Sequence, residues 1–374
     1  MLQKSEPRAL RPMRSASTLK LTDITARAEQ SEAFDHHEQI WLGEDETRGL
    51  TAIVAIHDTA LGPALGGTRI WPHATFDAAL TDALRLSRGM TFKAAIAAVP
   101  FGGGKAVIKA DARTDKTPAM LEAYAEMLAA LNGQYFTGED VGLTLADADF
   151  LRARTPNISG TTQGGSGNPS PVTAHGVFLG LKAAVSHALD KEDLGGLTVA
   201  VQGLGSVGWS LCEKLHEEGA RLVVADLDRT RAKQARAAFD AQTVDPAGIV
   251  ATDADVFAPC ALGAVLSTET IPTLKAKIVA GAANNQLARH EDAAELKRRG
   301  VLYAPDYVIN AGGLINVAAE LDPDGYDRSR VMERVARIPD ALSNIFARSD
   351  AENRPTNDIA QAIAEERIRG ARPG

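Results

Sequence analysis

The chain has 374 residues, of which 45% are hydrophobic and 24% charged, so it is an ordinary globular sequence of a length that predicts two domains. Its formal net charge of −8 at pH 7 argues against nucleic acid or an anionic membrane as the main partner. No apolar run approaches the roughly 20 residues that a membrane-spanning helix needs, so no membrane partner is expected.

The first domain is predicted as an α+β catalytic unit over residues 31–165. Before it, residues 1–30 carry basic side chains among small polar ones and lack the continuous apolar core of a signal peptide, so we expect a mobile extension there. β-branched residues and helically spaced apolar residues then predict strands and helices. The predicted elements are strand-like segments at 40–58, a glycine-rich turn at 62–67, and helices at 75–88 and 117–131.

The composition changes near residues 160–171, where Ser, Gly, Thr, Asn and Pro predominate, and this predicts a hinge. Beyond it, short β-branched segments alternate with helical patterns, which is typical of a parallel sheet with helices on both faces. We therefore expect a Rossmann-type doubly wound domain over 166–335 and a C-terminal helical segment, 336–374, that returns to the first domain. The predicted strands are 198–202, 222–225, 255–258, 277–280 and 301–304.

A dinucleotide fingerprint opens the second domain, because a buried-type strand runs directly into G-x-G-x-x-G and then a helix. The glycines allow a tight turn, close approach of a pyrophosphate and close packing of the helix, whose N-terminus attracts phosphate. The next strand ends on Asp226, 23 residues after the first glycine, where a carboxylate binds ribose hydroxyls and repels a 2′-phosphate. This favours NAD, although Arg229 nearby leaves NADP open. The predicted cofactor residues are Gly203, Leu204, Gly205, Ser206, Val207, Gly208 and Asp226.

Two lysines of the first domain have unusual neighbours. Lys93 precedes an alanine-rich apolar run, and Lys105 follows three glycines and precedes Ala, Val and Ile. Burial and a second ammonium group nearby both lower a lysine pKa, which would make such a lysine usable as a general base. A phosphate loop is excluded because Ala106 stands where Ser or Thr is required. Asp140 lies in a glycine-flanked turn, and composition alone favours a turn-forming role for it.

These residues lie in motifs that resemble those of the leucine, phenylalanine, valine and glutamate dehydrogenases. The resemblance extends from about residue 35 to about residue 345 and is closest to the leucine dehydrogenase branch. It implies an active site in a cleft between the two domains, with NAD as cofactor and a homo-oligomer as the functional form. The two isolated cysteines, which form no disulfide framework, fit a cytoplasmic protein. The motifs are 62–69, 102–105, 139–142, 258–263, 282–285 and 304–313.

The resemblance also implies roles in the oxidative deamination of an L-amino acid to a 2-oxo acid and ammonia. Lys105 would be the catalytic lysine, and Asp140 would exchange protons with the substrate amino group. Lys93 would bind the substrate carboxylate, with help from the backbone at Gly67 and from the pair Asn284-Asn285, of which Asn284 is also expected at the cofactor.

The side-chain pocket implied by the resemblance is apolar. Glutamate-specific members carry a lysine where Leu65 stands and a serine near Val317. An unpaired carboxylate is costly to bury beside Leu65, Leu314 and Val317, so glutamate is a poor substrate and a leucine, valine or isoleucine type is favoured. Gly138 and Leu314 are typical of phenylalanine-specific members, which keeps phenylalanine as the alternative.

One further alternative belongs to another functional class. A non-catalytic NAD-binding module would keep the fingerprint and lose Lys93, Lys105 or Asp140, but all three are present. A metal site is not predicted, because the two cysteines have no CxxC neighbour and the histidines lack ligand spacing. These residues are Cys212, Cys260, His36, His37, His57 and His73.

Overall fold

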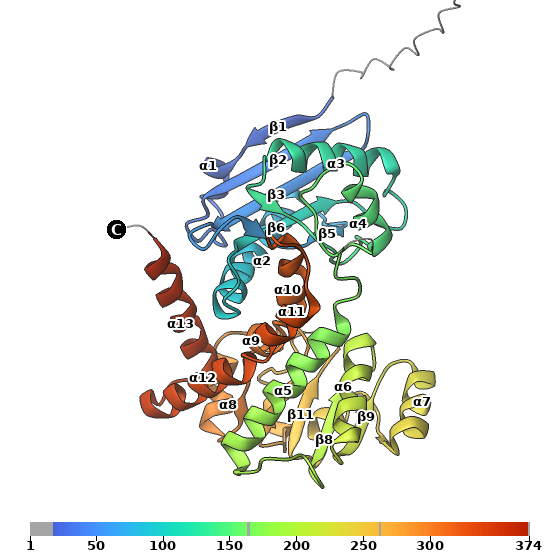
Figure 1. Cartoon of the computed structure of the whole chain (residues 1–374), viewed down its shortest axis with the longest axis vertical. Coiled ribbons are helices and arrows are strands. Elements are labelled where there is room, and N and C mark those ends of the chain that lie inside the picture. Colours follow the sequence, from blue (N-terminus) through green and yellow to red (C-terminus); the bar gives the residue numbers. More distant parts are fainter. Residues whose placement is uncertain (1–17, 163–164, 262, 373–374) are drawn as a thin grey trace, which may run out of the picture.

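The computed structural model describes residues 18–162, 165–261 and 263–372, which form two lobes (Figure 1). The upper lobe in Figure 1 holds a mixed sheet, and the lower lobe holds a parallel sheet between helices. This confirms the predicted fold class. No helix among the described residues is both long and apolar enough to cross a membrane.

The first domain is built on a seven-stranded sheet in the order β1-β2-β3-β6-β4-β7, with β5 also paired to β6. Strands β1, β2, β3 and β6 are antiparallel neighbours, whereas β4 and β5 run parallel to β6. The elements are β1 Lys20–Asp23, α1 Thr25–Ala28, β2 Gln39–Asp45, β3 Leu50–Asp58, β4 Ala64–Leu65, β5 Thr68–Trp71, α2 Phe76–Ile96, β6 Gly102–Lys109, α3 Pro118–Ala130, β7 Tyr135–Phe136 and α4 Leu145–Arg152.

Helix α2 covers one face of this sheet and is longer than predicted. Thr75 caps its start by accepting a hydrogen bond from the backbone N–H of Ala78. The helix predicted over 75–88 in fact continues to Ile96. Gly89 does not end it, because the residues that follow are buried against β6 and their packing offsets the cost of a glycine. The extra length matters, since it places Lys93 in the last turn.

The second domain is a six-stranded parallel sheet in the order β10-β9-β8-β11-β12-β13. Numbered within the domain this is 3-2-1-4-5-6, the order of dinucleotide-binding sheets. Its elements are α5 Ser170–Leu189, β8 Thr198–Gln202, α6 Ser206–Glu217, β9 Arg221–Ala225, α7 Arg229–Phe239, β10 Gln242–Thr243, η1 Ile249–Ala251, β11 Val256–Pro259, η2 Ile271–Thr273, β12 Ile278–Val279, α8 Asp292–Arg298, β13 Leu302–Tyr303, α9 Asp306–Ile309, α10 Gly312–Ala318, η3 Ala319–Leu321 and α11 Arg328–Val335.

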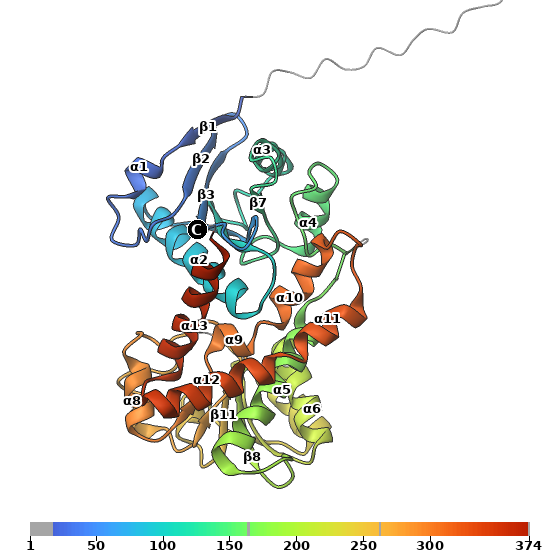
Figure 2. The same cartoon turned by 60° about the vertical axis from the view of Figure 1, so that its left-hand side comes forward.

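The C-terminal segment divides between the two domains. Helix α12 (Ile338–Glu352) packs on α5, and α13 (Thr356–Ala371) crosses to α2 of the first domain (Figure 2). There Arg367 donates hydrogen bonds of 2.8 and 2.9 Å to the carbonyl oxygens of Ala95 and Ile96 at the end of α2. One buried apolar cluster also joins Leu65 and neighbours to residues of α5, α10 and α12. The domains therefore share part of their core.

The expected N-terminal extension is wrong for its second half. Residues 20–23 form strand β1, which pairs antiparallel with β2, and the N–H of Ile24 donates to Ile40 O at 2.8 Å. Ile24 and Ala28 are buried against the sheet. The basic and polar composition concealed this strand, because an edge strand needs only one buried face and one paired side. Residues 1–17 lie outside the described residues.

Candidate active site

An ion pair between Lys105 and Asp140 lies in the first domain. Lys105 is a β6 residue only 7% exposed, and its Nζ lies 2.5 Å from Asp140 Oδ2. Burial lowers the pKa of Lys105, although Asp140 opposes the shift. Burial alone would raise the pKa of Asp140, but Lys105 and Arg69 hold it below its ordinary value. Asp140 Oδ2 thus lies between two cations, 2.5 Å from Lys105 Nζ and 3.4 Å from Arg69 Nε, and a carboxylate has capacity for a further hydrogen bond from an amino group.

Arg69 is a second cation at Asp140 and was not singled out from the sequence. Its Nε lies 3.4 Å from Asp140 Oδ2, and its Nη1 donates to Asp82 Oδ2 at 3.1 Å. His73 Nε2 approaches the same Asp82 oxygen at 3.2 Å. Strand register explains the position, since Arg69 pairs with Val107, which shares a face of β6 with Lys105. Arg69 ends the glycine-rich motif 62–69, so the motif held the signal.

Lys93 connects the first domain to the second. Its Nζ donates to Asn310 Oδ1 at 2.7 Å, and Asn310 Nδ2 donates in turn to Asn284 Oδ1 at 2.7 Å. Burial lowers the pKa of Lys93 to about 8, with a smaller push from Lys105 and an opposing pull from Asp306. Asn310 and Asp306 are site residues that the sequence analysis missed individually, although both lie in the motif 304–313.

Glycines allow the backbone segments of the site to touch. A Cβ at Gly66 would clash with the carbonyl oxygen of Gly104, and a Cβ at Gly67 would lie 2.8 Å from the carbonyl oxygen of Glu139. This close approach brings the loop of Asp140 against β6. Among the described residues the amide of Gly67 donates no hydrogen bond, which leaves it free for a ligand oxygen.

The predicted side-chain pocket draws its residues from both domains. Leu65 of β4 and Leu314 of α10 belong to one buried cluster and are 2% and 8% exposed. A Cβ at Gly138 would lie 4.0 Å from Val317 Cγ1 and 3.4 Å from the carbonyl oxygen of Ser159. The structure therefore places Gly138 opposite Val317, and buries Leu65 and Leu314 in the same apolar cluster. Asn285 follows Asn284 in the sequence, and its backbone has a φ of 52°.

The glycines of the fingerprint have the geometry that a dinucleotide requires. Gly203 has φ +94°, and a Cβ there would press on Ala261. A Cβ at Gly208 would clash with the carbonyl oxygen of Gly203, so only glycine lets α6 pack this closely. A Cβ at Gly205 would meet nothing within 4 Å, so the backbone there is open to a phosphate.

The N-terminus of α6 and the carboxylate of Asp226 also have the positions that a dinucleotide requires. Helix α6 begins at Ser206 and Val207 after an N-cap, Gly205, that makes no side-chain cap, so its first N–H groups face outward. Asp226 follows β9 and accepts hydrogen bonds from the amides of Leu204 (2.6 Å) and Asp228 (2.7 Å). This fixes its carboxylate beside the glycine turn, where a ribose would lie.

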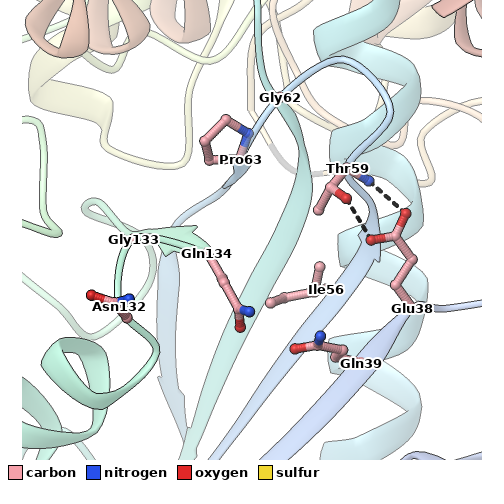
Figure 3. A pocket seen from close by; sticks show the side chains of 9 residues that line it. All are labelled: Glu38, Gln39, Ile56, Thr59, Gly62, Pro63, Asn132, Gly133 and Gln134. Atoms are coloured by element: carbon pink, nitrogen blue, oxygen red, sulfur yellow. Dashed lines mark hydrogen bonds between the residues drawn. The ribbon is translucent and has the colours of Figure 1, made fainter. Parts of the chain in front are cut away.

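The hollow of about 430 Å³ shown in Figure 3 is separate from these residues. Its only carboxylate is already engaged, because Glu38 accepts hydrogen bonds from the amide and hydroxyl of Thr59 at 2.9 and 2.6 Å. None of the predicted site residues lines it. The lining residues are Glu38, Gln39, Ile56, Thr59, Gly62, Pro63, Asn132, Gly133 and Gln134.

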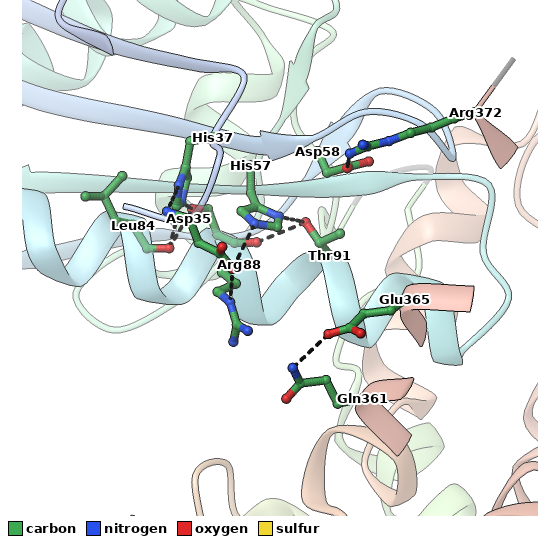
Figure 4. A network of polar contacts seen from close by, with 11 residues as sticks. Asp35, His37, His57, Asp58, Leu84, Arg88, Thr91, Gln361, Glu365 and Arg372 are labelled. Carbon is green, nitrogen blue, oxygen red and sulfur yellow. Dashed lines mark hydrogen bonds and ion pairs between the residues drawn. The ribbon is translucent and has the colours of Figure 1, made fainter. Parts of the chain in front are cut away.

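Two histidines are buried between α2 and the sheet (Figure 4). His57 Nδ1 lies 2.8 Å from Thr91 Oγ1, and His37 Nε2 lies 3.0 Å from Leu84 O. Burial lowers the pKa of both, that of His57 to about 4, so they are neutral near pH 7. Across the described residues no group of three or more His, Cys, Asp or Glu side chains could hold a metal ion.

Comparison with known proteins covers both domains. The family model described as Glu/Leu/Phe/Val dehydrogenase, dimerisation domain, matches residues 34–157, and the Glutamate/Leucine/Phenylalanine/Valine dehydrogenase model matches 164–230 and 224–372. The chain belongs to the Glu/Leu/Phe/Val dehydrogenase family. This confirms the resemblance read from the motifs.

Members of this family with named activities are similar over nearly the whole chain. The leucine dehydrogenase of Geobacillus stearothermophilus is 49% identical over 339 residues, covering 90% of this chain and 92% of the relative. The L-tryptophan dehydrogenase of Nostoc punctiforme is 48% identical over 333 residues, covering 89% and 93%. A crystal structure of L-tryptophan dehydrogenase from Nostoc punctiforme superposes with a TM-score of 0.81 at 46% identity, covering 90% of this chain and 97% of that one.

Proposed function

We propose that this protein catalyses the NAD-dependent oxidative deamination of an apolar L-amino acid of the leucine, valine or isoleucine type to its 2-oxo acid and ammonia. The observation that carries the proposal is the buried Lys105–Asp140 pair, 2.5 Å apart, which puts a potential base and a carboxylate side by side. Such a pair suits a substrate whose amino group binds the carboxylate and whose carbon is attacked by a water molecule that the lysine deprotonates. The similarity to leucine dehydrogenases adds support.

Binding of the substrate backbone would use the two charged ends of the site. Lys93 is still largely protonated at neutral pH, given its pKa of about 8, and attracts the carboxylate together with the free amide of Gly67. Asp140, ionised because its pKa is lowered, accepts a hydrogen bond from the amino group. Asn310 and Asn284 hold Lys93 from the second domain, so closure of the domains would orient the substrate.

The chemistry would then proceed through an imine of the substrate. A bound nicotinamide nucleotide supplies the hydride acceptor for the α-carbon. Lys105, with its pKa lowered by burial, removes a proton from water as the water oxygen bonds to the imine carbon. Asp140 would first take a proton from the substrate ammonium group, before the hydride leaves, and later return it to the nitrogen of the carbinolamine. The C–N bond then breaks, the hydroxyl proton passes to the departing ammonia, and the 2-oxo acid forms.

NAD is proposed as the nucleotide, because the carboxylate of Asp226 is held beside the open glycine turn and would repel a 2′-phosphate. The fingerprint residues Gly203–Gly208 would hold its pyrophosphate, and a role of Asn284 at the nucleotide is proposed from the family resemblance alone. A homo-oligomer is proposed as the functional form, since residues 34–157 match a domain described as a dimerisation domain.

The apolar substrate is supported by Leu65 and Leu314, which lie in one buried cluster and offer no partner for a side-chain carboxylate. Phenylalanine is the second candidate. Gly138 leaves the space of a methyl group facing Val317, and such space favours a larger side chain.

The test is a turnover assay of the purified protein with NAD against leucine, valine, isoleucine, phenylalanine, tryptophan and glutamate, with NADH and 2-oxo acid both quantified. We expect an apolar amino acid to be oxidised with equal yields of the two products, and glutamate to be a poor substrate. Turnover of glutamate alone, or of none of the six, would refute the proposal. NADP is run in parallel to rank the nucleotides.

A further inference from the structure

The loop that joins the two domains is held by one carboxylate from each of them. Asp149 of α4, in the first domain, accepts hydrogen bonds from the amide and hydroxyl of Thr162 at 2.8 and 2.6 Å. Glu320 of η3, in the second domain, accepts from the amides of Gly160 at 2.9 Å and Ser166 at 2.7 Å. The loop is therefore attached on both sides of the hinge.

The described residues of this loop lie close to Glu320. A Cβ at Gly165 would lie 2.8 Å from Glu320 Oε2, so the backbone passes directly over the carboxylate. Each of the two amides points at a different oxygen of the same side chain. A carboxylate satisfies both donors, whereas a glutamine offers one acceptor oxygen and turns its NH2 group toward the second donor.

Glu320 adjoins both walls of the proposed side-chain pocket. Three residues before it lies Val317, on the same continuous helical segment formed by α10 and η3. Gly160 follows Ser159, whose amide donates to Thr137 O at 2.9 Å and whose carbonyl oxygen would be 3.4 Å from a Cβ at Gly138. The hydrogen bond from Gly160 to Glu320 thus connects the wall of Val317 to the wall of Gly138.

We infer that Glu320 is a positioning residue that sets the width of the side-chain pocket, and hence the preference between small and large apolar substrates, by tying the α10–η3 segment to Gly160 and Ser166. The inference rests on the proposed function, since it concerns the pocket of that site. It assigns Glu320 no contact with substrate or nucleotide. In Glu320→Asp the shorter side chain would pull the wall of Val317 toward the wall of Gly138. In Glu320→Gln the loss of one of the two hydrogen bonds to the loop would let these walls separate.

The experiment compares Glu320→Gln and Glu320→Asp with the matched control Asp149→Asn, which neutralises a carboxylate that binds the same loop away from the pocket. For each variant, kcat/KM is measured with leucine and with phenylalanine, together with KM for NAD. Glu320→Gln should raise the phenylalanine-to-leucine ratio by about tenfold, the scale of one methylene in a pocket, and Glu320→Asp should lower it. Asp149→Asn should leave the phenylalanine-to-leucine ratio unchanged. KM for NAD should be unchanged in all three variants.

Hydrogen exchange resolved to single residues supplies a readout that does not need turnover. Exchange of the Gly160 and Ser166 amides should be faster in Glu320→Gln, and exchange of Thr162 should be faster in Asp149→Asn. An unchanged ratio in both Glu320 variants, a shift in the same direction in both, or an equal shift in Asp149→Asn would overturn the inference. If the wild-type protein oxidises no amino acid, the proposed function fails, and the exchange data alone then decide whether Glu320 holds the loop.

Discussion

The two domains differ in how much charge they bury. Of the six Asp, Glu, Lys, Arg and His side chains that are buried in the described part of the chain, five lie in the first domain. The second domain instead offers backbone, through the open Gly205 and the outward N–H groups at the start of α6. The buried groups are His37, Asp45, His57, Asp58 and Lys105 in the first domain and Asp292 in the second.

This difference predicts different vulnerabilities. Buried charge responds to pH and to the loss of one partner, because a low-dielectric interior amplifies each electrostatic change. The backbone N–H groups around Gly205 and the start of α6 do not titrate in this pH range, and they tolerate substitutions that keep the backbone conformation. Substitutions in the first domain should therefore change rate and pH behaviour, and substitutions around the fingerprint should change nucleotide choice.

The largest effect is expected from Lys105→Ala. Loss of a general base lowers turnover by about a hundredfold or more, while NADH binding, measured by fluorescence titration, should persist because its cradle lies in the other domain. Lys109→Ala, at the exposed end of the same strand, is the control and should turn over normally. A folded Lys105→Ala protein with wild-type turnover would remove Lys105 from the mechanism.

Acidification should destabilise the first domain through His57. Burial lowers its pKa to about 4 from the ordinary 6.5, so its contribution to stability is complete above pH 6.5 and is lost as the pH falls toward 4. The loss amounts to roughly 3 kcal/mol. His57→Asn should flatten the pH dependence of the free energy of unfolding in urea, whatever its effect at neutral pH. His216→Asn, exposed on α6, should keep the wild-type slope; equal slopes in wild type and His57→Asn would contradict the prediction.

Nucleotide choice should respond to Asp226→Ser. Removing a charged hydrogen-bonding group costs about 1.5–3 kcal/mol, so kcat/KM for NADP relative to NAD should rise about 10- to 100-fold. Asp228→Ser is the matched control, because serine keeps the cap that Asp228 provides to α7 through Thr230 N and the neighbouring carboxylate is retained. A wild-type preference for NADP would refute the role of Asp226 at once.

Substrate preference should respond to Gly138→Ala combined with Leu314→Val. The new methyl group fits, since its nearest neighbours would be 3.4 and 4.0 Å away, and it fills space opposite Val317. One methylene in a pocket changes kcat/KM by about 10- to 200-fold, so the ratio should move toward leucine or valine and away from phenylalanine. The two single variants serve as controls for additivity. An unchanged ratio would place the side-chain pocket elsewhere.

The smallest effect is expected from Arg69→Gln, which touches the ion pair but not the proposed position of the substrate. Arg69 lowers the pKa of both Asp140 and Lys105, so its removal should move both limbs of the pH–rate profile to higher pH. The maximal rate should change only severalfold. Arg113→Gln, on the exposed loop after β6, is the control. If the rate falls but the two limbs of the pH–rate profile do not move, Arg69 stabilises the fold and does not tune the pKa values of Asp140 and Lys105.

The sequence by itself determined the nucleotide-binding half almost completely. The strand predicted at 198–202 is β8, and the glycine, helix and acid that follow have the expected conformations. The reason is physical: a positive φ, a close helix contact and a strand-ending carboxylate are requirements on consecutive residues, so they leave a local pattern. Five of the six strands of the second domain were predicted, whereas β10, with only two residues and both exposed, left no such pattern and was missed.

Only the tertiary structure decided how the charges of the first domain are paired. The sequence singled out Lys93, Lys105 and Asp140, but the 2.5 Å contact of Lys105 with Asp140 depends on glycines that let distant segments touch. It missed Arg69, which reaches Asp140 through strand register, and Asn310, which lies 217 residues from Lys93 along the chain. It also missed strand β1. Burial and long-range contact fix which charges meet, and neither is a property of neighbouring residues.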